Sequence, residues 1–96
     1  MNIRFLKTAQ KELNDSFDWY ENQLSGLGYD FLKEVDSAIG RIITWPESHL
    51  GIGHGLHRCL VKRFPYSVIY GMENNTIVIV AMAHLHRKPY FWVERF

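Results

Sequence analysis

The chain has 96 residues, of which 47% are hydrophobic and 22% charged, and its net charge at pH 7 is +1. This length supports one hydrophobic core, so residues 1–96 are expected to form a single domain. No apolar run reaches the length of a membrane span, and no signal-peptide pattern precedes the first strand. The single cysteine, Cys59, cannot form an internal disulfide. We therefore expect a cytoplasmic protein with no membrane partner.

Charge is distributed unevenly along the chain. Residues 1–48 contain five Lys/Arg and eight Asp/Glu, a net charge of −3. Residues 49–96 contain six and two, a net charge of +4, together with all five histidines. An anionic partner is therefore expected to bind the second half. The alternative is that acidic helices neutralise a basic sheet, and the asymmetry favours a nucleic-acid partner only slightly.

The first half predicts a short strand at residues 3–6 and two helices. The first helix is expected to run from about Thr8, whose hydroxyl would cap it, to about Leu24. The second is expected from about Tyr29 to Trp45, because Pro46 disfavours helical geometry in its predecessor. A short glycine turn between two amphipathic helices predicts a helical hairpin. Apolar residues at helical spacing are expected inward: Ala9, Leu13, Phe17, Tyr20 and Leu24, then Phe31, Val35, Ala38, Ile39 and Ile42.

The second half has the period of strands. Residues 47–55, with three glycines, predict a loop, and residues 56–64 and 65–72 predict strands. A hairpin turn is expected at 73–76, followed by a strand at 77–83 whose apolar, β-branched residues indicate burial on both faces. The order β-α-α-β-β-β predicts an α+β fold, a helical hairpin packed on a small, largely antiparallel sheet. The last thirteen residues are expected to form an aromatic tail.

Polar side chains follow the buried strand at once, in the segment His84-Leu85-His86-Arg87-Lys88-Pro89-Tyr90. A rigid strand that ends in polar groups is typical of a functional site. Histidine transfers protons near neutral pH, a guanidinium stabilises a pentacoordinate phosphate, and a phenol relays protons. His84, Arg87 and Tyr90 are therefore candidate catalytic residues. The alternatives are that His84 only bonds a backbone carbonyl, that Arg87 anchors the tail, and that the aromatic residues cover the helices. For Trp92 the covering role is much favoured.

A second group of cations lies on the strand expected at residues 56–64. By the two-residue period of a strand, Arg58 and Lys62 share one face, whereas His57 and Arg63 share the other. Which face is buried stays open, since apolar residues lie on both. Either face would present cations along roughly 13 Å, a length that suits a polyanion backbone. The alternative is an ordinary solvated strand face.

Metal binding and nucleophilic catalysis have weak support. His84 and His86 lie two residues apart, but no CxxC or HExxH spacing supplies further ligands. The additional ligands to consider are His57, His54 and Cys59. Ser67, Thr8 and Cys59 are not expected to act as nucleophiles, because none has the Asp/His neighbours or the sharp turn that activate such a residue. We expect no metal and no cofactor.

Five motifs occur in order along nearly the whole chain. They are Ala9-x2-Glu12-Leu13, Trp19-Tyr20-Glu21, Gly26-Leu27-Gly28-x2-Phe31-x2-Glu34-Val35, Phe64-Pro65-Tyr66-x-Val68-x-Tyr70 and Ala83-His84-x2-Arg87-x-Pro89. Each is weak alone, but in this order and spacing they are specific. Together they resemble the RelE/ParE superfamily, the toxins of bacterial type II toxin–antitoxin (plasmid stabilisation) modules. The resemblance implies two helices on a small antiparallel sheet.

The resemblance also implies a growth-inhibiting toxin that a cognate antitoxin protein neutralises. RelE-like members cut mRNA on the ribosome without a metal, and ParE-like members inhibit DNA gyrase without established catalytic residues. We expect a ribosome-dependent mRNA endonuclease, because histidines and cations gather at one end of the sheet. The alternative is a ParE-type gyrase inhibitor, since the chain is less basic than ribosome-directed members. A third possibility is an inactive or antitoxin-only relic whose charges are only solvated. The expected catalytic residues are Arg58, His84, Arg87 and Tyr90, and the expected substrate-binding residues are Lys62, Arg63, His57 and His86.

Overall fold

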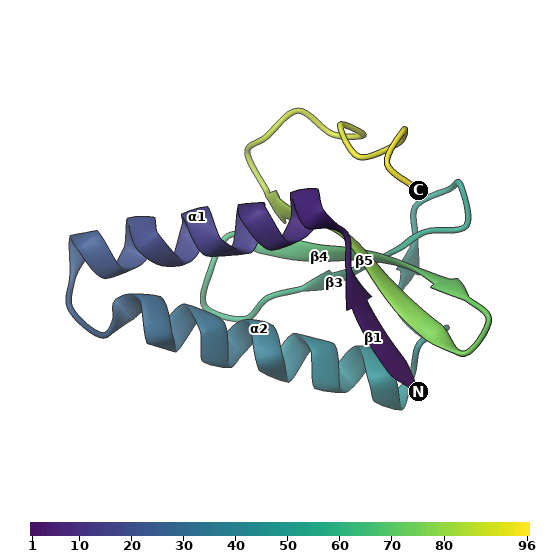
Figure 1. The fold of residues 1–96 in the computed structure, drawn as a ribbon, viewed down its shortest axis with the longest axis horizontal. Coiled ribbons are helices and arrows are strands. Elements are labelled where there is room, and N and C mark those ends of the chain that lie inside the picture. The colour runs from purple at the N-terminus through teal and green to yellow at the C-terminus, as the bar shows by residue number, and fades with distance from the viewer.

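The computed structural model describes all 96 residues as two helices packed on a five-stranded sheet (Figure 1). In chain order the elements are β1 (Asn2–Phe5), α1 (Lys7–Gln23), α2 (Leu27–Thr44), β2 (Leu50–Gly51), β3 (His57–Leu60), β4 (Tyr66–Glu73) and β5 (Thr76–His84). The α+β class and the helical hairpin are as predicted. Neither helix has both the length and the apolar character needed to cross a membrane.

The sheet has the strand order β1-β5-β4-β3-β2. β1 pairs with β5 in parallel, and the other three pairs are antiparallel, so the sheet is largely antiparallel as predicted. Residues 77–83 of β5 are buried throughout, which confirms a strand covered on both faces. The loop predicted at residues 47–55 contains a strand after all, because the two residues of β2 pair with His57 and Arg58.

A β-bulge in β5 decides which side chains reach each face of the sheet. The pairing passes from Ile69–Ala81 to Tyr70–Ile79, so Val80 is an extra residue opposite β4. Val80 and Ala81 consequently pack in the same apolar cluster instead of on opposite faces. Beyond the bulge the register brings His84, the last residue of β5, opposite Tyr66.

One face of the sheet, called here the helix face, packs against α1 and α2. Phe31 is fully buried at the centre of this core, with its ring centroid 5.1 Å from Tyr20, 5.3 Å from Phe64 and 5.1 Å from Tyr66. Several aromatic pairs meet edge to face, the arrangement that the ring quadrupoles favour. Of the residues predicted inward, Leu24 is exposed, since it lies just beyond the end of α1.

Both helices begin earlier in the sequence than predicted. α1 begins at Lys7 without a side-chain cap, so the capping role of Thr8 is wrong: this residue already lies in the first turn. α2 begins at Leu27, earlier than expected, because the Glu21 carboxylate accepts hydrogen bonds from the backbone N–H groups of Gly26 and Gly28. These amides would otherwise lack partners at the helix N-terminus. The predicted end of α2 at Trp45 is confirmed.

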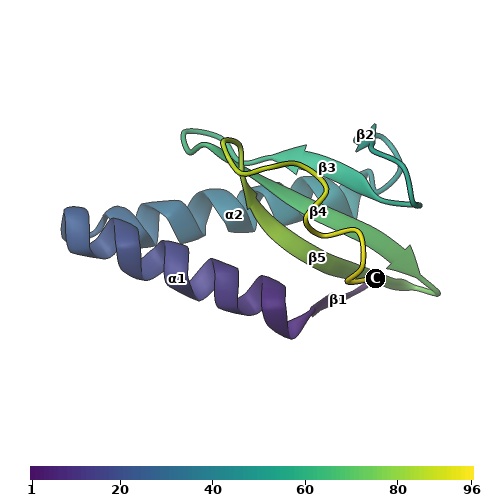
Figure 2. The same ribbon diagram turned by 90° about the horizontal axis from the view of Figure 1, so that it is seen from above.

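The opposite face of the sheet, called here the tail face, is covered by the C-terminal tail, residues 85–96. Figure 2 shows this segment crossing β4 and β5. Trp92 is buried there, and Phe96 packs on Gly71, where a Cβ atom would lie 2.7 Å from its ring. The covering role of Trp92 is thus confirmed, but the prediction that the tail covers the helices is wrong. The apolar run of β5 presents side chains to both faces of the sheet, and the tail buries those on the second face.

Candidate functional site

A small hollow opens on the tail face where β5 ends and the tail begins. Its volume is about 80 Å³, and its walls come from β3, β4, β5 and the tail. We call this the basic hollow. The polar residues that line it are Arg58, Ser67, His84 and Arg87, with Trp92 on the tail side. The fold therefore brings together three of the four predicted catalytic residues, which lie up to 29 positions apart in the sequence.

Ser67 is the residue of the basic hollow that sequence analysis did not identify as a binding group. Its side chain is only 1% exposed, and its hydroxyl oxygen has no hydrogen-bond partner. A buried hydroxyl without a partner costs about 1–3 kcal/mol, so such groups are rare unless something else satisfies them. Its sequence signal is a single hydroxyl between apolar residues of β4, which alone does not distinguish a core serine from a ligand-binding one.

The orientation of His84 is fixed by its neighbours. The backbone N–H of His86 donates to Nδ1 of His84 at 3.1 Å, and the His84 ring packs edge to face with Tyr66 at 5.0 Å. Because Nδ1 accepts a hydrogen bond, the neutral ring carries its proton on Nε2. Nε2 is therefore the nitrogen that remains available to a ligand.

Arg87 both lines the basic hollow and anchors the tail. Its guanidinium donates to Glu12 Oε2 at 2.9 Å and lies 3.5 Å from the centroid of the Phe91 ring. Glu12, which is 15% exposed, also accepts from Arg95 at 2.8 and 3.0 Å and from the backbone N–H of Met82. The two alternatives drawn from the sequence, a site residue and an anchor, thus coincide in one side chain.

Glu12 and Arg95 were missed by sequence analysis, although they hold this region together. The signal for Glu12 was its place in the Ala9-x2-Glu12-Leu13 motif, and the signal for Arg95 was a charge in an otherwise aromatic tail. Their pairing joins residues 83 positions apart, so no local spacing reveals it.

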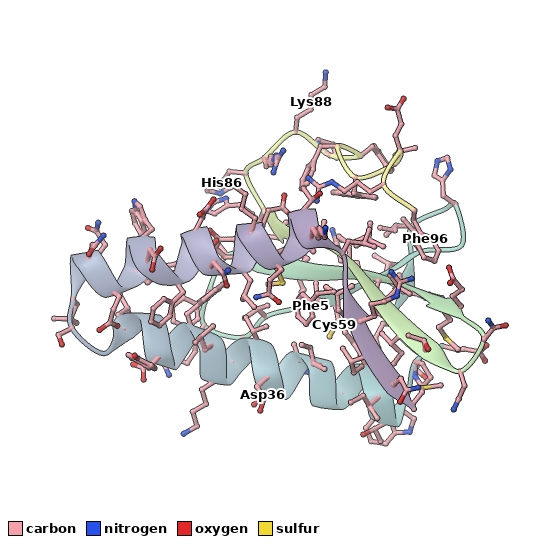
Figure 3. The ribbon with its side chains drawn as sticks, in the orientation of Figure 1. Phe5, Asp36, Cys59, His86, Lys88 and Phe96 are labelled. Carbon is pink, nitrogen blue, oxygen red and sulfur yellow. The ribbon has the colours of Figure 1, made fainter.

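Three other predicted site residues, Tyr90, His86 and Lys62, lie around the basic hollow rather than in it. Tyr90 is exposed, has a φ of 66°, and does not line the hollow. His86 is exposed and packs against His84 at 5.2 Å, while Lys88 projects outward from the tail (Figure 3). Lys62 lines a second hollow, of about 440 Å³, together with Arg58, so Arg58 contributes to both.

Two predicted substrate-binding residues lie away from this region. His57 stacks on the buried Tyr70 ring at 5.4 Å, so it belongs to the helix face. Arg63 has a φ of 71° and forms ion pairs with Glu34 at 3.7 Å and Asp30 at 3.9 Å, both on α2. The structure therefore answers the question that the sequence left open. Cys59 and Val61 face the core, and Arg58 faces the tail side.

The titrating groups with clearly shifted pKa values are mainly structural. Burial, with a smaller contribution from Cys59, raises the pKa of Tyr70 to about 12. Burial likewise raises the pKa of the Cys59 thiol, against the opposing effect of the Arg41 guanidinium. Both side chains belong to the core of the helix face. No three histidine, cysteine, aspartate or glutamate side chains are grouped as ligands of a metal ion.

No protein-family model and no curated protein sequence matches the chain. Among solved structures, a chain of the chromosomal ParDE TA system from P. aeruginosa is similar to it, with a TM-score of 0.77 and 12% sequence identity. The match covers 90% of this chain and 97% of that chain. This chain therefore shares the fold of that chain, two helices on a largely antiparallel sheet, as the motifs implied.

Proposed function

We propose that the protein is the toxin of a type II toxin–antitoxin module, which inhibits growth until a small cognate antitoxin binds it. The support is a fold shared with a chain of a ParDE system together with the five RelE/ParE-like motifs.

The activity that the geometry favours is metal-independent cleavage of mRNA on the ribosome, in the cytoplasm. The observation that carries this proposal is the basic hollow, where two arginines, a histidine and an unpaired hydroxyl converge. In the proposed reaction the ribose 2′-oxygen bonds to phosphorus while the bond from phosphorus to the 5′ oxygen breaks. The products are a 2′,3′-cyclic phosphate and a 5′-hydroxyl. One proton leaves the 2′-hydroxyl and one reaches the 5′ oxygen, so no oxidant or cofactor is required.

The residues of the hollow divide into two roles. Arg58 and Arg87 stabilise the charge that develops on the phosphoryl oxygens. Lys62 positions the sugar–phosphate backbone of the mRNA next to them. His84 is the first candidate for proton transfer, through Nε2, because Tyr90 lies outside the hollow. Tyr90 remains the second candidate, since it directly follows Pro89, a residue that lines the hollow.

The second candidate function is inhibition of DNA gyrase without catalysis. The observation that favours it is the neutralisation of the tail cations. Glu12 pairs with both Arg87 and Arg95, and the whole chain carries a net charge of only +1. A weakly basic surface suits a protein target better than a polyanion.

Expression without an antitoxin tests the toxin assignment, and two assays then separate the targets. We expect growth arrest, cleavage of mRNA by the purified protein on translating ribosomes, and no effect on supercoiling by gyrase. Arg58→Ala should abolish cleavage, whereas Arg4→Ala, which alters an exposed arginine paired with Glu73 on β4, serves as the matched control. Supercoiling inhibition with intact mRNA would reverse the ranking. Normal growth with folded protein would remove the toxin assignment.

A further inference from the structure

A third hollow, called here the aromatic hollow, adjoins the basic hollow. Its volume is about 370 Å³, and it is lined by Trp19, Tyr20, Pro65, Tyr66 and His84. This volume lies within the range of about 300–1,000 Å³ that small-molecule sites occupy. His84 lines both hollows and thus forms their common wall. Nothing in the roles given to the basic hollow explains this set of rings.

The rings of the aromatic hollow are held in place yet leave a face open. Trp19 packs edge to face on Tyr20 at 5.1 Å, and 59% of its surface is exposed. Tyr66 is held by a hydrogen bond that the Ser16 hydroxyl donates to its phenol oxygen, at 2.9 Å. A fixed, exposed indole beside a second ring is the arrangement on which proteins stack unpaired nucleobases.

The chemistry of the neighbouring groups decides between a nucleobase and an apolar protein side chain. A nucleotide carries a planar base and a phosphate on one sugar, and the two hollows offer rings and cations on either side of His84. The nearby carboxylates do not repel a phosphate strongly, because Glu12 is paired with two arginines and Asp15 is paired with Lys11. An apolar side chain would use the rings but would leave the Ser67 hydroxyl without a partner.

We propose that the aromatic hollow binds one base of the mRNA, stacked on Trp19, while the adjacent phosphate occupies the basic hollow. This inference rests on the proposed endonuclease function and adds to it a base-binding residue on α1. Stacking one base on an aromatic side chain changes affinity by about 5- to 150-fold. Trp19 is therefore expected to hold the base beside the cleaved bond, without taking part in the reaction itself.

The test uses ribosomes programmed with a short mRNA that carries, at each position of the codon in turn, either its natural base or an abasic nucleotide. The wild-type protein should cleave the mRNA about 5- to 150-fold more slowly when one particular base is missing. Trp19→Ala should show the same loss with the natural mRNA and should no longer respond to that abasic position. Trp19→Phe, which keeps a ring, should recover most of the rate.

Trp45→Ala is the matched control, because Trp45 is a tryptophan of similar exposure, 61%, at the end of α2. It should cleave like the wild type. The proposal is overturned if no abasic position slows the wild type, or if Trp19→Ala cleaves at the full rate. Trp19→Ala that cleaves normally but escapes neutralisation would mean that an antitoxin side chain occupies the hollow. Failure of the endonuclease proposal is distinct, since the wild type would then leave the natural mRNA intact.

Discussion

The two faces of the sheet are buried by different means. On the helix face, two regular helices close a continuous aromatic core, and even the buried Tyr70 hydroxyl donates to the backbone oxygen of Pro46. On the tail face, twelve residues without regular structure (Figure 2) cover a smaller apolar cluster. Beneath them the hydroxyl of Ser67 has no hydrogen-bond partner. The face that the helices cover has no buried side-chain polar atom without a partner, whereas the face that the tail covers has one, next to a hollow at the strand ends.

The faces also differ in how their cover is attached. The helical hairpin is held by a core of aromatic and aliphatic side chains, but the tail depends on a few anchors, chiefly the Glu12 cluster and Trp92. Segments with few buried contacts open locally at lower free energy than the core. We therefore expect damage on the helix face to unfold the whole domain and damage on the tail face to release only the tail.

The largest stability effect is expected for Phe31→Ala, at the centre of the helix face. Phe31 is fully buried among Tyr20, Phe64 and Tyr66, so truncation leaves a cavity and costs about 3–5 kcal/mol in the free energy of unfolding. Urea denaturation followed by far-UV circular dichroism measures this loss.

Trp92→Ala is the counterpart on the tail face. Trp92 is also a large buried ring. The tail can detach locally when this ring is removed, so no cavity persists, and we expect a loss of about 1–3 kcal/mol in the free energy of unfolding. Limited proteolysis should then cut the tail before the helices. Equal destabilisation by Phe31→Ala and Trp92→Ala, without early tail cleavage, would mean that the two faces form one cooperative unit.

The next effect concerns activity. His84→Ala and Arg58→Ala each remove a group from the basic hollow, and the loss of one transition-state donor typically lowers the rate about 10²–10³-fold. Both variants should lose toxicity while their melting temperatures stay close to that of the wild type. Arg87→Ala should lose toxicity and also stability, because this side chain pairs with Glu12. Full toxicity of His84→Ala and Arg58→Ala would refute the site even if the fold is right.

A smaller effect is expected from neutralising the carboxylate that anchors the tail. Glu12→Gln weakens the hydrogen bonds to Arg87 and Arg95, and because the Glu12 side chain is only 15% exposed, we expect a loss of about 2 kcal/mol in the free energy of unfolding. Amide hydrogen exchange should rise in residues 85–96 and stay low in α2. Asp15→Asn is the control one turn along α1, since its pair with Lys11 is exposed and should contribute little. The anchor model fails if both variants behave alike.

Local patterns predicted most of the fold. The apolar stripes of α1 and α2 and the unbroken apolar run of β5 are determined by neighbours within a few positions, so the sequence displays them directly. Pro46 fixed the end of α2 for the same reason. The two-residue strand β2 was missed because it depends on pairing with β3 rather than on its own residues.

The candidate site was less accessible to prediction, since long-range contacts create it. The position of His84, Arg58 and Arg87 around one hollow depends on the bulge in β5 and on the register of β3 and β4, none of which has a local signal. Arg63 was assigned to RNA by alternation along a strand. That strand, however, ends at Leu60, and Arg63 lies in a turn that faces α2. Charge type was thus readable from the sequence, but charge partners were not.

The smallest effect is a pH dependence confined to the helix face. The pKa of Tyr70 is raised to about 12 in the folded protein, whereas an unfolded tyrosine has a pKa of about 10. Between these values the unfolded chain loses the phenol proton first, so stability is complete below pH 10 and falls as the pH rises towards 12. The expected loss from this group at pH 11 is about 1.4 kcal/mol relative to pH 8. Tyr70→Phe should be slightly less stable at neutral pH, because it loses the hydrogen bond to Pro46, and its stability should decline less between pH 10 and 12. The stability of Tyr70→Phe should still decline somewhat over this pH range, because the pKa of Tyr20 is also raised. Denaturation in urea at each pH measures both curves. Parallel curves for the two proteins would show that the phenol of Tyr70 is not the group that destabilises the helix face in alkali.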